Sequence, residues 1–483
     1  MRHLVRTCLA VALVAGTLAV SGPAVAARPS PSGRLVDASF VSRALGGERE
    51  RLRVYVPAGC TRARPCAVLY LLHGFGGDWT YWTEGGRVVE FATRPTPLPL
   101  VLVMPDGGPA GFWTDWFNEG AYGPPRYETM FVRELMPFVE RTFPVRRGRA
   151  WTGIDGASLG GFGSWKLALK HPHRFASVGS ISGALNVLVA PGAPVTVAAP
   201  VAIPWTGDAA PRPPPPPAPD IPGFPFGNPF RTFGDPVTNE WYYRTNNPLD
   251  LAANARGLAM RQLVFDAEPA AEPPSAGTFG DVGLEAAVLP MNLEMDARLT
   301  ALGYDHEFEL ARGNHSWASR YPFIREQLEF HARALNGRAR PPAAFEYRSA
   351  ESSFEAYGWR FEVDRPVHEF LELGFGPGGF TARGGGGVTW VTSPPVPRAC
   401  RSYRFAYEGS WHSGGGGGDG GEVGRRLRFR VNLGESSPVD HHDATHALGP
   451  WQPTTSVEVR LAGPGCTVSG PGWAPGPMAE PGG

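Results

Sequence analysis

Short apolar runs alternate with helix-like segments between residues 50 and 335 of this 483-residue chain. Residues 67–72 and 98–104 are almost unbroken apolar runs, which are typical of parallel strands covered on both faces. Residues 176–181 and 262–265 predict two further buried strands. This alternation of strands and helices predicts an α/β fold with a mostly parallel sheet.

Residues 128–143 predict a helix, because apolar residues recur there every three or four positions. Pro137 lies inside this segment, and a proline within a helix predicts a kink. The side chains that we expect to be buried are Phe131, Leu135, Phe138, Val139 and Phe143.

A second pattern begins after residue 338, where apolar residues occupy every second position. The clearest cases are Trp359, Phe361 and Val363, and Leu427, Phe429 and Val431. Such alternation predicts antiparallel strands with one buried face. We therefore expect a small antiparallel, β-rich domain over residues 339–470, followed by a disordered tail over residues 471–483.

The first 26 residues have the composition of an export signal. Basic residues open the segment, residues 9–20 are apolar, and Ala24-Val25-Ala26 fits a cleavage site. The apolar run is too short to span a bilayer comfortably. We expect a signal peptide over residues 1–26, a catalytic domain over residues 27–338, and a secreted protein without a transmembrane segment.

Proline and glycine are abundant, with 51 and 63 residues, which predicts a loop-rich chain. Residues 191–236 form a Pro-rich insertion, and Pro213 to Pro217 within it are consecutive prolines. Such a stretch favours extended polyproline II structure over helix or sheet. A long insertion is either a functional lid over a site or a tolerated surface loop, and the residues leave both interpretations open.

The charge balance excludes one functional class. The chain has 45 basic and 45 acidic residues, so its formal net charge is zero. Only two of the basic residues, Lys166 and Lys170, are lysines, and the arginines are scattered along the chain. Because the positive charge typical of nucleic-acid binding is missing, we expect no nucleic-acid partner.

The cysteines favour disulfides. Removal of the signal peptide also removes Cys8 and leaves four cysteines, and an even number in an exported chain is typical of disulfide pairing. Their local spacing suggests the pairs Cys60–Cys66 and Cys400–Cys466. The spacings fit no zinc pattern.

The segment Gly156-Ala157-Ser158-Leu159-Gly160 fits the pattern G-x-S-x-G. A strand-like segment, residues 151–154, precedes it, and a helix-like segment, residues 162–170, follows it. A sharp turn between a strand and a helix holds a serine in a strained conformation that exposes its hydroxyl. Ser158 is therefore the candidate nucleophile.

A serine nucleophile needs a base, and the base needs an acid to orient it. His315 lies in a loop between a strand-like segment and a helix, where a histidine can reach across a sheet edge. His306 lies within the strand-like segment, and we expect it on the surface. The acid should follow the strand that ends at Phe265, where five candidates stay open: Asp266, Glu268, Glu272, Asp281 and Glu285.

Acyl transfer also needs donors for the oxyanion. One is the backbone N–H of Leu159, directly after the nucleophile. The other should come from the glycine-rich loop after an early strand, Leu71 to Gly77, where Phe75 is the candidate. We expect His73 to shape this loop rather than to act as a base.

Five motifs occur in an order that is known from one family. They are Leu71-Leu72-His73-Gly74, Met104-Pro105-Asp106-Gly107-Gly108, Phe112-Trp113-Thr114-Asp115-Trp116, Gly156-Ala157-Ser158-Leu159-Gly160-Gly161 and Asn314-His315-Ser316-Trp317. Together they resemble the putative-esterase branch of α/β hydrolases, which includes antigen 85 mycolyltransferases, esterase D, and feruloyl or acetylxylan esterases. The resemblance covers residues 50–335.

The resemblance implies an α/β-hydrolase fold and a serine esterase or acyltransferase that needs no metal or organic cofactor. It implies Ser158 as nucleophile and His315 as base. It also implies Phe75 and Leu159 as the oxyanion donors. An ester substrate, including a lipid or carbohydrate ester, would be the partner.

The resemblance also bears on the acid. Mycolyltransferases use the glutamate of a Leu-Glu pair that opens a helix, and Leu284-Glu285 matches that pair, so Glu285 is our choice. Esterase D instead places an aspartate soon after the strand, which keeps Asp266 and Glu268 open. His73 stands where mycolyltransferases carry an aspartate that meets the sugar acceptor, a departure that leaves trehalose specificity open.

Two further groups lie in the β-rich domain. The segment Asp440 to His446 contains metal-ligand residue types, but nothing in the sequence fixes their geometry, so we expect no metal site. Four tryptophans either fill a core or contact cell wall or polysaccharide: Trp359, Trp390, Trp411 and Trp451. A catalytically silent binding protein on a hydrolase scaffold is therefore the alternative to an enzyme.

Overall fold

The computed structural model describes most of the chain between residues 26 and 462. The described ranges are 26–30, 33–117, 125–187, 232–234, 239–268, 281–365, 368–376, 378–384, 387–395, 402–407, 410–414, 421–423, 426–433 and 455–462. The predictions for the signal peptide, most of the Pro-rich insertion, Cys400–Cys466, Glu272, Asp440 to His446 and the tail lie outside the described residues.

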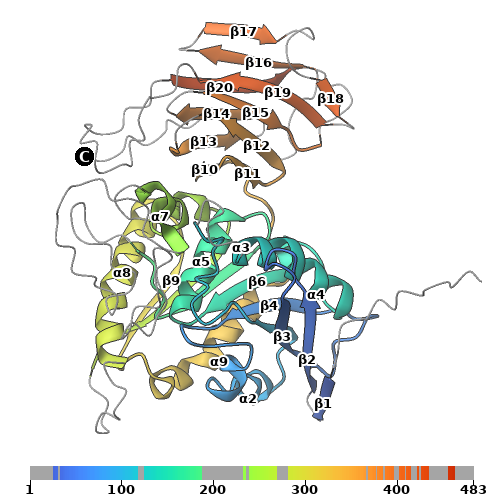
Figure 1. Cartoon of the computed structure of the whole chain (residues 1–483), viewed down its shortest axis with the longest axis vertical. Coiled ribbons are helices and arrows are strands. Elements are labelled where there is room, and N and C mark those ends of the chain that lie inside the picture. The colour runs from blue at the N-terminus through green and yellow to red at the C-terminus, as the bar shows by residue number, and fades with distance from the viewer. Residues whose placement is uncertain are drawn as a thin grey trace, which may run out of the picture.

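Among the described residues, a nine-stranded sheet forms the centre of the larger domain (Figure 1). Six neighbouring strands are parallel, in the order β5, β4, β6, β7, β8 and β9. At the other end of the sheet, β1, β2 and β3 pair antiparallel with one another, and β3 pairs antiparallel with β5. In spatial order the strands are β1 (Ala26–Ser30), β2 (Gly33–Val41), β3 (Arg49–Pro57), β5 (Leu100–Pro105), β4 (Ala67–Leu72), β6 (Thr152–Gly156), β7 (Ser177–Ile181), β8 (Ala259–Phe265) and β9 (Glu307–Ala311). The four strands predicted from apolar runs are confirmed as β4, β5, β7 and β8.

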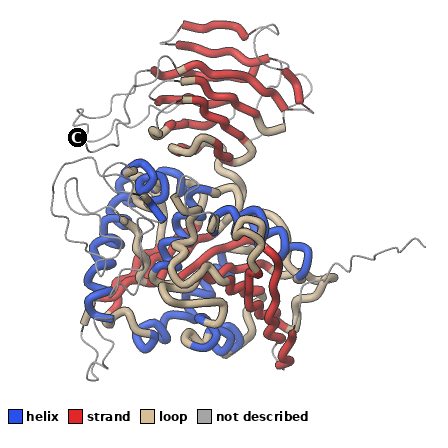
Figure 2. Tube along the Cα trace, viewed as in Figure 1, coloured by secondary structure: helices blue, strands red, loops and turns tan. Residues whose placement is uncertain are grey.

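Helices cover both faces of this sheet (Figure 2). Successive side chains of a strand point to opposite faces, and β4 shows the consequence. Val68 and Tyr70 share a core with Trp165 of α5, whereas Leu69 and Leu71 share another with Leu328 of α9. The helices are α1 (Tyr81–Glu84), α2 (Val88–Thr93), η2 (Arg149–Trp151), α5 (Leu159–Lys170), α7 (Glu240–Asn246), η4 (Ala252–Ala255), α8 (Asp281–Ala301) and α9 (Trp317–Ala334).

The helix predicted over residues 128–143 is present, and it changes from π-helical to α-helical hydrogen bonding next to the proline. It runs as α3 (Tyr127–Thr129), a π-helical segment η1 (Met130–Leu135) and α4 (Met136–Thr142). Pro137 lies next to the change from π-helix to α-helix, and it cannot donate a backbone hydrogen bond to the preceding turn. The five side chains predicted to be buried are all buried.

The second domain is a sandwich of two antiparallel sheets, which confirms the predicted β-rich fold. One sheet orders its strands as β10 (Phe345–Ser349), β13 (Leu371–Gly376), β14 (Gly379–Gly384), β20 (Thr455–Ala462), β16 (Ser402–Tyr407) and β17 (Ser410–Gly414). The other contains β11 (Ser353–Ala356), β12 (Trp359–Asp364), β15 (Val388–Thr392), β19 (Arg426–Asn432) and β18 (Gly421–Val423). Aromatic rings meet between the sheets, as Phe361 and Phe380 do at 5.5 Å between centroids.

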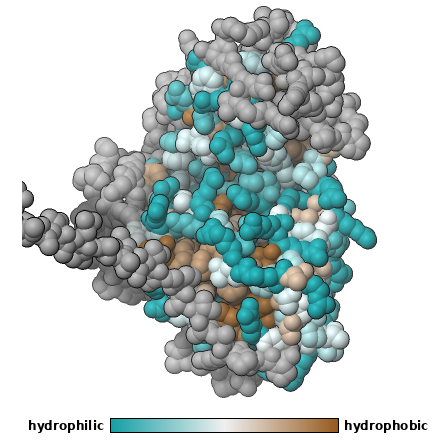
Figure 3. Space-filling view, turned by 90° about the vertical axis from the view of Figure 1, so that its right-hand side faces the viewer, coloured by the Kyte–Doolittle hydropathy of each residue, from teal (hydrophilic) through white to brown (hydrophobic). Residues whose placement is uncertain are grey.

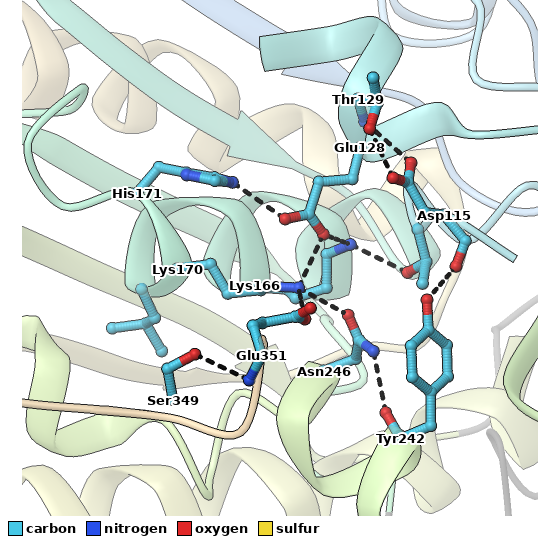
Figure 4. A network of polar contacts seen from close by, with 12 residues as sticks. Asp115, Glu128, Thr129, Lys166, Lys170, His171, Tyr242, Asn246, Ser349 and Glu351 are labelled. Carbon is cyan, nitrogen blue, oxygen red and sulfur yellow. Dashed lines mark hydrogen bonds and ion pairs between the residues drawn. The ribbon is translucent and has the colours of Figure 1, made fainter. Parts of the chain in front are cut away.

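The two lysines of the chain lie in a buried ionic network where the two domains meet (Figure 4). The ammonium groups of Lys166 and Lys170 lie 2.8 and 3.1 Å from the same oxygen of Glu128. Lys170 also pairs with Glu351 of the β domain at 2.7 Å. Although burial disfavours its charged form, the two lysines hold the pKa of Glu128 well below its usual value.

We expect Glu128→Gln to lower the free energy of unfolding by about 3–5 kcal/mol, because it leaves two buried ammonium groups without their shared carboxylate. Urea unfolding of the full chain measures this loss. The control is Glu90→Gln, which removes a carboxylate from the exposed pairs with Arg87 and Arg94 and should cost about 1 kcal/mol or less. Equal losses in the two variants would contradict a structural role for the buried network.

Candidate active site

Ser158 lies in a strained turn between β6 and α5. Its backbone φ of 58° is uncommon for a residue with a side chain, and it marks the sharp bend that the sequence motif predicts. A Cβ atom on Gly156 would lie 2.1 Å from the carbonyl oxygen of Gly160, and one on Gly160 would lie 2.1 Å from that of Leu72. Glycine is therefore required on both sides of Ser158. The serine itself is half-buried, so it is not sealed inside the protein.

His315 and Glu285 form a buried hydrogen-bonded pair. The Nδ1 atom of His315 lies 2.7 Å from Oε2 of Glu285, whose side chain is completely buried. The other carboxylate oxygen accepts hydrogen bonds from the Ser182 hydroxyl and the Phe265 N–H, both at 2.8 Å. Because an ionised carboxylate only accepts, Nδ1 carries the proton and Nε2 of His315 is left as the acceptor.

Ser158 and the His315–Glu285 pair lie at the same edge of the sheet. Ser158 follows β6 and Ser182 follows the adjacent strand β7, and the Ser158 N–H donates to the carbonyl of Ile181 at 2.9 Å. One residue further, Ser182 binds Glu285. The Nε2 atom of His315 is buried and has no hydrogen-bond partner within the described ranges, so the structure does not join it to Ser158 by a hydrogen bond. Such catalytic contacts often tighten only when substrate binds.

Arg320 places a positive charge near His315, and it is held by Tyr81. The buried guanidinium of Arg320 donates through Nη1 to the Tyr81 hydroxyl at 3.0 Å. Gly74 lies between this hydroxyl and Ser158. If Gly74 carried a Cβ atom, that atom would lie 3.0 Å from the Tyr81 hydroxyl and 3.3 Å from the Cβ atom of Ser158. The missing side chain of Gly74 therefore leaves room between Ser158 and the residues that neighbour His315.

Burial and the nearby charge of Arg320 lower the pKa of His315, while the hydrogen bond to Glu285 acts in the opposite direction. A lowered pKa keeps the imidazole neutral into mildly acidic solution. This is the protonation state in which Nε2 can accept a proton.

The two predicted oxyanion donors lie in adjoining segments. Leu159 is the first residue of α5, so its N–H has no acceptor within the helix. Phe75 is half-buried in the loop after β4. A Cβ atom on Gly160 would lie 2.7 Å from the His73 carbonyl oxygen, which shows how closely the start of α5 packs against this loop.

His73 shapes that loop, as expected. Its Nε2 atom accepts the Gly107 N–H at 2.9 Å, so Nδ1 carries the proton and donates to the Gly74 carbonyl at 2.8 Å. Burial lowers the pKa of His73 to about 4, despite the opposing effect of its hydrogen bond to Gly74. A neutral, fully engaged imidazole has no capacity left to act as a base.

The competing acids have other partners. Asp266 accepts the Gly313 N–H at 3.0 Å, and Glu268 pairs with Arg312, so both support the loop that carries His315. The carbonyl of Asp281 accepts the His315 N–H at 3.0 Å. Of the described candidates, Glu285 is the one whose carboxylate hydrogen-bonds to the imidazole.

The prediction that His306 lies on the surface is wrong. Its side chain is 8% exposed and its Nε2 atom lies 2.7 Å from Asp296 of α8. The residue precedes β9 rather than lying in it, and the helix beside the strand covers it. His306 is thus held by a structural pair and remains separate from Ser158.

A second Ser-His-Asp set, which sequence reasoning missed, lies inside the protein. Ser177 hydrogen-bonds to Nδ1 of His331 at 2.8 Å, and Nε2 of His331 lies 2.9 Å from Asp155. All three side chains are 0–1% exposed. No ester can reach them, so this set ties α9 to β6 and β7 and does not compete with Ser158.

A family model named Esterase, with the description "Putative esterase", matches residues 42–330, which is more than half of the chain. The chain belongs to this esterase family. The match contains Ser158, Glu285 and His315.

Among curated relatives, an esterase of Mycobacterium tuberculosis is 38% identical over 126 residues, 26% of this chain and 26% of the relative. The acetyl esterase of Caldicellulosiruptor saccharolyticus is 32% identical over 127 residues, 26% of this chain and 44% of the relative. The diacylglycerol acyltransferase/mycolyltransferase Ag85A of Mycobacterium leprae is 29% identical over 194 residues, 38% of this chain and 55% of the relative. The matches thus span from about a quarter to just over half the length of these relatives.

Solved structures with a similar chain path include an S-formylglutathione hydrolase from Agrobacterium tumefaciens, with 19% identity and a TM-score of 0.47. It covers 65% of this chain and 99% of its own. MPT51 of Mycobacterium tuberculosis shows 19% identity and a TM-score of 0.46 and covers 65% of this chain and 100% of its own.

We expect the pKa of His315 to lie below 6.5, the ordinary value for histidine, and to rise in Arg320→Gln, because this variant removes a neighbouring positive charge. NMR titration of labelled histidine Cε1 signals, assigned with a His315→Asn variant, measures both values. The control is Arg325→Gln, whose guanidinium lies on the same helix but pairs with Glu329. An unchanged His315 pKa in Arg320→Gln would contradict this electrostatic account.

Proposed function

We propose that this protein is a secreted serine esterase that cleaves carboxylic esters through an acyl-enzyme. The observation that carries the proposal is the buried Glu285–His315 pair at the sheet edge that also holds the strained Ser158 turn. A nucleophile, a base and an orienting acid are the three parts that serine hydrolysis requires. Membership of the esterase family supports the same reaction class.

In this mechanism the Ser158 hydroxyl attacks the ester carbonyl while Nε2 of His315 takes its proton. The backbone N–H groups of Phe75 and Leu159 stabilise the oxyanion of the tetrahedral intermediate. His315 then gives the proton to the leaving alcohol, and the acyl group remains on Ser158. Water attacks this acyl-enzyme, again with His315 as base, and releases the acid.

Export is part of the proposal. It rests on the signal-like composition of residues 1–26 and on the predicted Cys60–Cys66 disulfide, which the structure confirms. Disulfides persist in oxidising compartments outside the cytoplasm. Among the described residues, no helix is long and apolar enough to cross a bilayer.

Acyl transfer to an alcohol is the second candidate, and the similarity to Ag85A favours it. Both reactions share the acyl-enzyme and differ in the group that resolves it. His73, at the position where mycolyltransferases carry an acceptor-binding aspartate, is 1% exposed and has both ring nitrogens engaged. A residue in this state cannot bind a sugar hydroxyl, so we favour hydrolysis.

A catalytically silent, wall-binding role receives less support. Trp359 is 2% exposed in the sandwich core, so it fills that core rather than a binding face. Trp390 lies outside the core, with the guanidinium groups of Arg428 and Arg430 at 4.6 and 5.6 Å from its ring. Contact of the β domain with polysaccharide therefore remains a proposal that rests on Trp390.

We expect Ser158→Ala to abolish cleavage of p-nitrophenyl acetate without changing the fold. Glu285→Gln should lower kcat by about 10⁴-fold, because the amide no longer fixes the tautomer of His315. The matched control is Glu294→Gln on the same helix, whose carboxylate binds Asn186 and which should keep wild-type turnover. Steady-state kinetics and circular dichroism check these outcomes, and wild-type turnover in Ser158→Ala would show that the nucleophile is wrongly assigned.

We expect free acid to remain the main product when excess glucose or trehalose is added to the esterase reaction. The reason is that His73 offers no acceptor-binding group at the predicted position. Mass spectrometry of the products measures the ratio of free acid to acylated sugar. Acylated sugar as the dominant product would replace hydrolysis with transfer as the function.

A further inference from the structure

A cavity of about 350 Å³ lies between the catalytic domain and the β domain. Its walls come from the segment around Glu128, from the residues at and after the end of α5, and from β10 to β12. Neither Ser158 nor His315 lines it. Ser158 precedes α5 and Lys170 ends it, so the twelve residues of this helix place the cavity roughly 18 Å from the nucleophile. It is therefore separate from the candidate active site.

Each acidic side chain that lines this cavity has a cationic partner. Asp115 lies 3.6 Å from Arg126, and Glu355 lies 3.6 Å from Arg360. Glu128 pairs with both lysines and lies 2.9 Å from His171. Glu351 pairs with Lys170 at 2.7 Å. Glu128 and Glu351 belong to the polar network of Figure 4, and the paired carboxylates leave little negative charge to repel an anion.

Two arginines of the cavity are not neutralised. The Nε atom of Arg174 is buried and has no hydrogen-bond partner within the described ranges. Arg133 forms no ion pair with any carboxylate that the structure describes, and its side chain is exposed at the rim. The nearest carboxylate oxygen to His173 is that of Glu355, at 3.9 Å.

The electrostatics of His173 show that these groups act at one place. Burial first, and then the charges of His171, Arg174 and Arg133, lower the pKa of His173 to about 2. The guanidinium groups of Arg174 and Arg133 therefore lie within electrostatic reach of the same imidazole. On one side of the molecule, hydrophilic side chains dominate the surface where the two domains meet (Figure 3).

We propose that this interdomain cavity binds a compact anion of monosaccharide size through its carboxylate or phosphate group, with Arg133 and Arg174 as the recognising residues. Arginine matches the geometry of carboxylate and phosphate, and an unpaired buried donor gains most from such a partner. The volume is at the small end of ligand pockets, which suits one sugar unit rather than a chain. The bound anion would contact both domains at once.

Two sources can supply this chemistry, an acidic sugar or a free phosphate. Isothermal titration calorimetry of the full chain at low ionic strength compares sodium galacturonate, inorganic phosphate and, as the neutral control, glucose. Low salt matters because screening weakens charge-assisted binding. We expect saturable binding of galacturonate and none of glucose. Binding of phosphate without galacturonate would support the anion site with phosphate as its source.

Substitutions of arginines inside and outside the cavity test whether the anion binds there. We expect Arg174→Gln to weaken the affinity about tenfold or more, through loss of a charge-assisted contact. Arg133→Gln, whose exposed side chain makes it a safe substitution for folding, should weaken it in the same direction. Arg64→Gln is the matched control, because this exposed arginine lies outside the cavity and should leave binding unchanged.

The Ser158→Ala variant should bind the anion like the wild type, and Arg174→Gln should keep wild-type esterase turnover. These two results separate the anion site from the proposed catalytic site, so either proposal can fail alone. The inference is overturned if neither galacturonate nor phosphate binds saturably. It is equally overturned if Arg174→Gln and Arg133→Gln bind the anion as tightly as Arg64→Gln.

Discussion

The hydrogen bond between Glu285 and His315 is the contact on which the proposed chemistry depends. A carboxylate without solvent contact is costly unless every acceptor is used, and here Ser182 and the Phe265 N–H occupy the second oxygen. Three parts of the fold must therefore be correct together: the end of β8, the second turn of α8 and the loop after β9. A shift in any of them would remove either the tautomer or the position of the base.

The same residue types serve different purposes according to their access to solvent. Ser177, His331 and Asp155 repeat the composition of a triad, but their complete burial limits them to holding α9 against the sheet. Ser158 instead sits half-buried on a strained turn, where a substrate can approach. The chemistry is thus decided by backbone geometry and exposure rather than by the presence of Ser, His and Asp.

The sequence was most informative where function is encoded locally. The turn around Ser158 could be predicted because its glycines and its flanking strand and helix are contiguous. The acid could not be chosen from the residues alone, because five carboxylates follow β8 and the choice depends on how α8 packs; the family resemblance supplied Glu285. Arg320 gave no signal, since its relation to His315 arises only from the winding of α9. His306 was misplaced because the strand-like alternation of its own segment does not show that the preceding helix α8 folds back beside it and pairs it with Asp296.

The most direct test of the account is the site of covalent labelling by a fluorophosphonate, read by mass spectrometry of the digested protein. The account predicts one adduct, on the peptide that contains Ser158, and its loss in His315→Asn, because the serine is not nucleophilic without its base. Labelling of a different residue, or undiminished labelling of Ser158 in the His315→Asn protein, would contradict the central claim that His315 activates this serine.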